Sequence, residues 1–251
     1  MAPSRGSFLL IAYTPELRSD DRRPLAILHA MERTLPGLRL SWTIADEGGF
    51  TPAPLGDARA TATMSGGGMQ VFCNGNRDHL VTITGWETPA FRNAGGKPQF
   101  EVHAKWPLDV TGVAAAGEVL EEVSEGGRAF WAHVTPEDAA GDIAEQTSSA
   151  LAGPPPPRGL PALKLPWNIR LPEIPHRLGW LNYWSAAAAE VLGFPDKTRD
   201  TDLLSRSRRS ATGGWIVRLT DAPLDLDNPA HLDVLLRAYE RFPQIGGRAT
   251  P

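Results

Sequence analysis

The chain has 251 residues, which is long enough to bury a substantial core in one large domain or in two small ones. Hydrophobic residues make up 41% and charged residues 22% of the sequence, close to the averages for folded proteins, which excludes disorder of the whole chain. The net charge of −4 argues against nucleic-acid binding, and Cys73, the single cysteine, excludes an internal disulfide framework and a multi-thiolate zinc site.

The first apolar run, Phe8 to Tyr13, predicts a strand. This run is too short for the core of a signal peptide, and no stretch of about 18 apolar residues predicts a transmembrane helix. A lone cysteine fits a reducing compartment. We therefore expect a soluble, cytoplasmic protein that does not act at a membrane.

The following part of the chain predicts one helix and several strands. Residues 24–35 have a proline in the first turn and end at a Pro-Gly pair, as a helix does. Alternating apolar and polar residues predict strands with one solvated face over 38–45 and 99–106. Asn74-Gly75 predicts a tight hairpin turn between two further strands, within residues 69–86. Strands that are wet on one face are typical of an antiparallel sheet.

Two helices separated by a strand are predicted next. From Asp109 onward, apolar residues form one stripe of a helix, opposite four glutamates. A strand from Phe130 then leads into the second helix, with Thr135 as its N-cap and Pro136 as its first residue.

Residues 153–175 hold eight prolines, too many for a helix or a central strand. They predict an extended Pro-rich connector, which we interpret as a stiff strap lying over the domain. A polyproline ligand for a recognition domain is the alternative reading.

The C-terminal part predicts two helices around one strand. Trp180 and Trp184 fall at helical spacing in a helix that ends at Gly193. Alternation predicts a strand over residues 215–220, and a stripe of apolar residues predicts a helix over 232–242.

Together these elements predict an α+β fold with a mainly antiparallel sheet and helices packed on one face of it. We expect residues 1–251 to form a single domain, with the Pro-rich connector at 153–175 inside it.

A group of aspartates and His231 lies between the predicted strand and the last helix. Carboxylates and imidazoles can bind a divalent metal, and an Asp/His site near residues 225–231 could serve a small hydrolase. Helix capping accounts for the same residues, because Asp227 or Asn228 is a natural N-cap and Pro229 a natural first helical residue. We therefore predict no metal and no cofactor, and the hydrolase site is the alternative.

No other pattern marks a catalytic centre. Cys73 has no identifiable base near it and suits a small buried residue of a strand. His103 and His133 could each act as a general base, but no orienting carboxylate is identified for either. We therefore predict that the protein is not an enzyme and has no catalytic residue.

Four stretches of the C-terminal third carry a family resemblance. They are LGWLNYWS at 178–185, GGWIVRLTDAPLD at 213–225, HLDVLLRAYERFP at 231–243 and IGGR at 245–248. They resemble bacterial immunity proteins of polymorphic-toxin and contact-dependent competition systems, in particular the immunity protein 52 type and related myxobacterial families. The resemblance implies that a cytoplasmic protein binds a cognate protein toxin stoichiometrically and covers its active site. An enzyme or a secretion-associated component is the competing class.

The charge distribution predicts where such a partner would bind. Residues 1–150 hold 19 acidic and 12 basic side chains, and four glutamates crowd the solvent side of one predicted helix, where like charges repel. Carboxylates in this position would attract a toxin with a basic cleft. The predicted partner-binding residues are Glu101, His103, Glu118, Glu121, Glu122 and Glu125.

Overall fold

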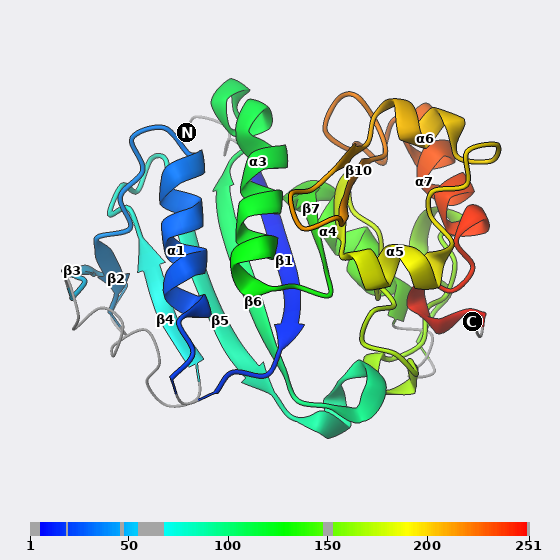
Figure 1. Cartoon of the computed structure of the whole chain (residues 1–251). Helices are drawn as coiled ribbons and strands as arrows, with labels where there is room; N and C mark the ends of the chain where they lie inside the picture. Colours follow the sequence, from blue (N-terminus) through cyan, green and yellow to red (C-terminus); the bar gives the residue numbers. More distant parts are fainter. Residues whose placement is uncertain (1–5, 19, 46–47, 55–67, 148–152, 250–251) are drawn as a thin grey trace.

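The computed structural model describes residues 6–18, 20–45, 48–54, 68–147 and 153–249 (Figure 1). Within them lies one ten-stranded sheet with the strand order β3-β2-β4-β5-β6-β1-β7-β8-β10-β9, and every neighbouring pair is antiparallel. The strands are β1 (Ser7–Pro15), β2 (Trp42–Ile44), β3 (Phe50–Pro52), β4 (Gly68–Cys73), β5 (Thr82–Thr88), β6 (Gln99–Pro107), β7 (Trp131–Pro136), β8 (Leu181–Trp184), β9 (Arg208–Arg209) and β10 (Trp215–Arg218).

Helices accompany the sheet, and the predicted α+β class with a mainly antiparallel sheet is confirmed. The α-helices are α1 (Arg23–Thr34), α3 (Val110–Gly127), α4 (Glu137–Ala144), α5 (Ala186–Leu192), α6 (Thr201–Ser205) and α7 (Pro229–Arg241). Short 3-10 helices are η1 (Ala90–Arg92), η2 (Ala94–Gly96), η4 (Pro157–Gly159), η5 (Pro166–Asn168) and η6 (Ile245–Gly247).

One face of the sheet is covered by α1 and α3, which lie side by side across its central strands (Figure 1). Leu10 of β1 lies opposite Ala104 of β6 and Val134 of β7, and all three side chains are buried. Trp106 lies on the same side of β6 as Ala104 and donates its Nε1 hydrogen to the carbonyl oxygen of Gly112 in α3, at 3.2 Å. The main core therefore fills the space between the sheet and these two helices.

In the described part of the chain, the opposite face is covered over β1, β7, β8 and β10. There the ring of Tyr13 stacks on Trp131, with centroids 4.2 Å apart. The ring of Trp184 meets Phe242, which follows α7, at a centroid distance of 5.0 Å. The helices therefore do not all share one face, because the end of α7 packs on the side away from α1 and α3.

Among the described residues, the side chains on this second face of β2, β5 and β6 are partly or fully exposed. Trp86 lies opposite Glu101, and Thr84 lies opposite His103. The side chains of Trp86 and Trp42 are 38% and 36% exposed, respectively. We call this surface the open sheet face, and it comprises Trp42, Ile44, Thr84, Trp86, Glu101, His103 and Lys105.

The predicted helix around Trp180 and Trp184 is wrong in its first half. Residues 181–184 form β8, and helix α5 begins only after Ser185, whose hydroxyl accepts a hydrogen bond from the backbone N–H of Ala188. All four residues of β8 are buried because both of its faces are covered. A strand buried on both faces has no alternating pattern, so its apolar residues can match helical spacing by chance.

Three other boundaries differ from the predictions. The strand predicted over 38–45 is limited to Trp42–Ile44. Residues 38–41 belong to no strand, and the side chains of Leu38 and Leu40 are buried in the core. The two strands around Asn74-Gly75 do pair as a hairpin, but the predicted tight turn is wrong, because the loop spans residues 74–81. The side-chain oxygen of Asn74 organises this loop by accepting hydrogen bonds from the backbone N–H groups of residues 76 and 81. Thr135 and Pro136 end β7, so α4 begins at Glu137.

The Pro-rich segment 153–175 contains no α-helix and no strand, only η4 and η5. Leu160, Leu163 and Ile169 are buried along it. The backbone N–H of Leu163 donates to the carbonyl of Gln146, and that of Lys164 donates to the carbonyl of Gly246. Buried leucines and backbone hydrogen bonds thus hold this segment against the rest of the protein.

Candidate functional site

The four glutamates of α3 lie on the face opposite to Glu101 and His103, so the structure does not bring the six predicted binding residues together. Glu121 is only 9% exposed and contacts the guanidinium of Arg208, which also bonds Glu118 at 2.8 Å. The hydroxyl of Thr212 donates to Glu125 at 2.8 Å.

Glu122, the fourth of them, receives a hydrogen bond from Arg33 of α1 at 2.7 Å. These four carboxylates therefore have partners within the chain, because they bond α1 and the segment from β9 to β10.

The aspartates near His231 form a turn and a helix cap. Asn228 is the N-cap of α7, and its side chain accepts a hydrogen bond from the backbone N–H of Ala230 at 3.0 Å. His231 Nδ1 accepts from the backbone N–H of Asp225 at 3.1 Å, which occupies that ring nitrogen. The capping interpretation, with Pro229 as the first helical residue, is confirmed.

Among the residues that the structure describes, no group of three or more His, Cys, Asp and Glu side chains is arranged to hold a metal ion. Within the same residues, no helix combines the length and the apolar character needed to cross a membrane.

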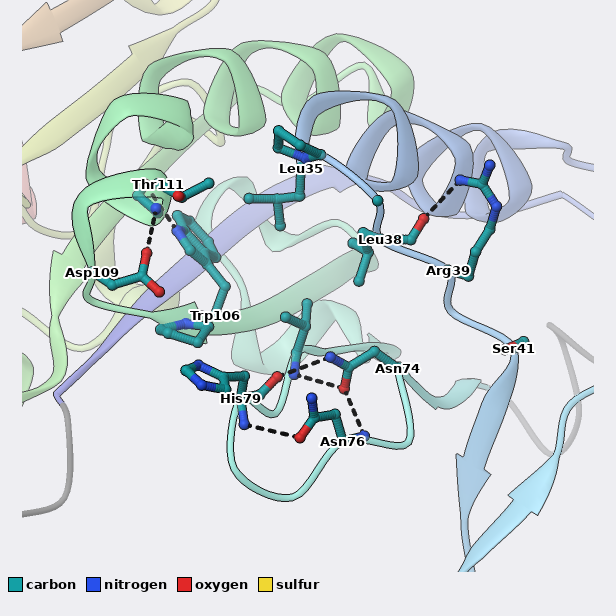
Figure 2. Close-up of a pocket in the computed structure, with 15 residues that line it drawn as sticks. Leu35, Leu38, Arg39, Ser41, Asn74, Asn76, His79, Trp106, Asp109 and Thr111 are labelled. Carbon is teal, nitrogen blue, oxygen red and sulfur yellow. Dashed lines mark hydrogen bonds between the residues drawn. The ribbon is translucent and has the colours of Figure 1, made fainter. Parts of the chain in front are cut away.

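A pocket of about 390 Å³ lies between the end of α1, the β4–β5 loop and the start of α3. Figure 2 shows the side chains that line it. Several of its polar side chains form hydrogen bonds with the backbone of the surrounding loop and helix. Asn76 accepts hydrogen bonds from the backbone of residues 78 and 79, and Asp109 caps α3 through Gly112. The pocket therefore owes its lining to turn and cap geometry.

On the open sheet face, Glu101 and His103 form a polar pair. His103 Nε2 lies 2.6 Å from Glu101 Oε1, and the His103 ring lies 4.5 Å from the ring of Trp86. Burial, followed by the neighbouring charge of Glu101 and a hydrogen bond to it, raises the pKa of Tyr13 far above its usual value. Glu101 thus links the exposed part of this face to the buried ring of Tyr13.

Next to Tyr13 lies a group that we call the histidine–arginine cluster, which comprises His133, His176 and Arg177. The His176 ring is 4.8 Å from both Tyr13 and Trp131, so two aromatic rings fix its position. His133 Nδ1 is bonded to Thr135 Oγ1 at 3.0 Å, whereas His133 Nε2 and both ring nitrogens of His176 are buried without a hydrogen-bond partner.

Electrostatics keep these imidazoles neutral. Burial, reinforced by the positive charge of Arg177, lowers the pKa of His176 to about 3. Burial and Arg177 also lower the pKa of His133 well below its usual value. Because both rings are neutral near pH 7, each offers one hydrogen-bond donor and one acceptor.

Sequence reasoning found only part of this region. It placed Glu101 and His103 on a solvated strand face and noted His133 as a lone histidine. It did not select Tyr13, His176 or Arg177 as site residues. Tyr13 is placed by the pairing of β1 with β6 and β7, and His176 packs on it only because the chain after the Pro-rich segment returns to this face of the sheet. A pairing signal between strands would have been needed to find them.

Comparisons with known proteins give one family and one fold. The family model described as "Domain of unknown function (DUF5953)" matches residues 19–250. No curated protein matches the sequence. The fold is similar to that of a solved chain described as "Pseudomonas aeruginosa T6SS protein PA0821", with a TM-score of 0.55 over 94% of this chain and 74% of that chain. At 11% sequence identity, this likeness concerns the fold alone.

Proposed function

We propose that this chain, which belongs to the DUF5953 family, is an immunity-type protein that binds a cognate bacterial toxin one to one and catalyses no reaction. The observation that carries the proposal is the open sheet face, on which two exposed tryptophans of β2 and β5 share one surface with a partly buried Glu–His pair of β6. The likeness to a T6SS protein and the resemblance of the C-terminal third to immunity proteins support the same context.

The composition of the open sheet face suits a protein partner. Tryptophan is enriched at protein interfaces because it buries a large apolar area and still offers an N–H donor. Trp42 and Trp86 lie on two strands of one face, so a single flat partner surface can cover both. Glu101 and His103 add polar groups that can be matched by the partner and so favour one toxin over another.

Of the six residues predicted to bind the partner, Glu101 and His103 remain in the proposed interface. The α3 carboxylates already bond arginines and Thr212 within the chain, so docking on them would have to compete with those contacts. Because the open sheet face carries charges of both signs, we expect the toxin affinity to depend only weakly on salt.

The proposal is tested with the product of a toxin gene located beside this gene, once the genomic neighbourhood identifies one. The affinity of the purified toxin is measured by calorimetry for the wild type and for Trp86→Ala and His103→Ala. Phe91→Ala is the matched control, because Phe91 is a 72% exposed aromatic residue that lies on η1, outside the open sheet face. We expect Trp86→Ala to weaken binding by tenfold or more, as an interface hot spot does, and Phe91→Ala to leave it within twofold.

Each variant is first compared with the wild type by circular dichroism and thermal unfolding, so that a folding defect is not taken for lost contact. Equal affinities in all four proteins would place the interface elsewhere. Absence of any complex with the neighbouring toxin would reject the proposed function.

A further inference from the structure

A second pocket, of about 670 Å³, lies where the end of β1, the start of α1 and the end of α3 meet. The two helices lie side by side across the sheet (Figure 1), and the loop from β1 to α1 completes the lining. This volume lies within the range of about 300–1,000 Å³ that small-molecule pockets occupy. The pocket shares no lining residue with the pocket of Figure 2 or with the open sheet face.

Arg23 holds the walls of this pocket together. Its side chain is only 11% exposed and pairs with Asp21 at 2.6 Å. The same guanidinium donates to three backbone carbonyl oxygens, those of Pro15, Glu16 and Gly127, at 3.0, 2.6 and 3.2 Å. One arginine therefore fixes the end of β1, the start of α1 and the end of α3 relative to one another, so the pocket is formed before any ligand binds.

The remaining charged residues of the lining are not paired. Arg18, Arg22 and Arg128 are exposed, and so are Glu16 and Asp20. Among the residues that the structure describes, none of these five side chains forms an ion pair. Three guanidinium groups and two carboxylates thus line one pocket without neutralising one another.

The backbone of Arg128 favours a role for its side chain. Arg128 is the C-cap of α3 and has the left-handed conformation, with φ of 54° and ψ of 46°. Glycine is the usual residue in this conformation, because a Cβ atom is strained there. The chain nevertheless has an arginine at this position, directly after Gly126 and Gly127, and this arginine lines the pocket.

The two kinds of charge in the pocket recognise different groups of a ligand. Guanidinium groups bind phosphate oxygens through paired, charge-assisted N–H bonds. Carboxylates repel a phosphate but accept hydrogen bonds from hydroxyl groups. A ligand that satisfies both therefore carries a phosphate group in one part and hydroxyl groups in another.

We propose that this pocket binds a small phosphate ester that bears hydroxyl groups, the class to which sugar phosphates and nucleotides belong. Arg18, Arg22 and Arg128 hold the phosphate, and Glu16 and Asp20 accept hydrogen bonds from the hydroxyl groups. The exposed side chains give the ligand access from solvent. The proposal does not depend on the proposed immunity function.

The probes are ribose 5-phosphate, inorganic phosphate and ribose, each titrated into the full chain by calorimetry. We expect saturable binding of ribose 5-phosphate with a dissociation constant of about 1 mM or tighter. Inorganic phosphate should bind at least fivefold more weakly, and ribose more weakly still.

Arg128→Gln should weaken the binding of ribose 5-phosphate at least tenfold, and Arg22→Gln repeats the test at a residue outside α3. Arg218→Gln is the matched control and should stay within twofold of the wild type. Arg218 is an exposed arginine of β10, outside the pocket, for which the structure shows no ion pair with a described carboxylate. Circular dichroism and thermal unfolding of each variant show whether the fold is kept.

The double variant Glu16→Ala/Asp20→Ala tests the carboxylates. It should bind ribose 5-phosphate no more tightly than inorganic phosphate, while its affinity for inorganic phosphate stays equal to that of the wild type or rises, because two negative charges are removed. A purely structural role of these residues would not produce this split between the two probes.

Three results would overturn the proposal: no saturable binding of ribose 5-phosphate, equal binding by the wild type and both arginine variants, or equal affinity of the wild type for ribose 5-phosphate and inorganic phosphate. A single-stranded RNA oligonucleotide separates a free phosphate ester from a nucleic acid. If the wild type bound this oligonucleotide more tightly than ribose 5-phosphate, the arginines would belong to a nucleic-acid surface, which contradicts the small-molecule proposal.

Discussion

Arg208 of β9 contacts the carboxylate of Glu121 in α3, a residue 87 positions earlier in the chain. Glu121 is nearly buried, and Arg208 also bonds Glu118 of the same helix. One arginine therefore ties the end of the sheet to the helix that covers it.

The first prediction concerns this contact. Arg208→Ala leaves Glu121 buried without its charged partner, so we expect it to lower the free energy of unfolding by about 1–3 kcal/mol. Arg199→Ala is the control, because its pair with Asp196 is exposed to solvent and should contribute less to stability. Urea denaturation of both variants measures the difference, and equal losses would contradict the assignment.

The second prediction is a pH dependence. The pKa of His176 is lowered to about 3 in the folded chain, whereas an unfolded histidine titrates near 6.5. The unfolded state therefore binds more protons below pH 6.5, so stability is complete above that pH and falls as the pH drops toward 3. The loss is about 1.4 kcal/mol per pH unit for this residue, and His133 adds to it.

Unfolding free energies measured between pH 7.5 and 4.5 check this prediction. His176→Phe removes one titrating group, and its stability should fall less steeply with decreasing pH than that of the wild type. Parallel curves for the two proteins would show that His176 titrates normally.

The third prediction compares two glycines. A methyl group at Gly179 would lie 2.8 Å from the carbonyl oxygen of Val134 in β7, so Gly179→Ala should destabilise the protein by about 1–3 kcal/mol. Gly117 of α3 has no atom within 4 Å of its added methyl group, and Gly117→Ala should stabilise the helix by about 0.5–1 kcal/mol. Opposite shifts in melting temperature are expected, and shifts of the same sign would contradict this account.

The fourth prediction tests the cap of α7. Asn228→Ala removes the side chain that accepts the Ala230 N–H and should cost about 0.5–2 kcal/mol. Asp227→Ala loses only an exposed contact with Arg158 and should cost less. Neither variant should change the metal content of protein purified without added ions, and a stoichiometric metal that disappears with Asp227 would restore the metal interpretation.

The fifth prediction is that residues 1–251 unfold as one unit. β7 and β8 pair directly, so strands from before and after the Pro-rich segment belong to one sheet. We expect a single denaturation transition, with coincident tryptophan fluorescence and circular dichroism. Proteolysis near Pro157 that released two stable, separate fragments would contradict it.

The elements with one wet face could be predicted from the sequence. Residues 99–106 alternate cleanly because β6 has one covered and one open face, and this placed Glu101 and His103 correctly on the solvated side. Trp180 and Trp184 could not be assigned in the same way, since β8 is covered on both faces.

The surroundings of the charged residues were harder to predict. The spacing of the α3 glutamates correctly put them on one side of a helix. Their partners Arg208 and Thr212 lie almost 90 residues further along the chain, and the pairing of β9 with β10 places them beside α3. Arg177 gave no signal, because the sequence alone does not show that, among the described residues, no carboxylate forms an ion pair with it.

The position of β1 in the sheet has a consequence for synthesis on the ribosome. β1 is synthesised before its neighbours in the sheet, β6 and β7. Leu10 therefore has no cross-strand partner until Ala104, and later Val134, has been synthesised. Until residue 107 has left the ribosome, both edges of this apolar strand lack their partners and can pair with another chain. Early binding of β1 by a chaperone, or a pause that delays β6, would therefore decide how much of the nascent protein aggregates.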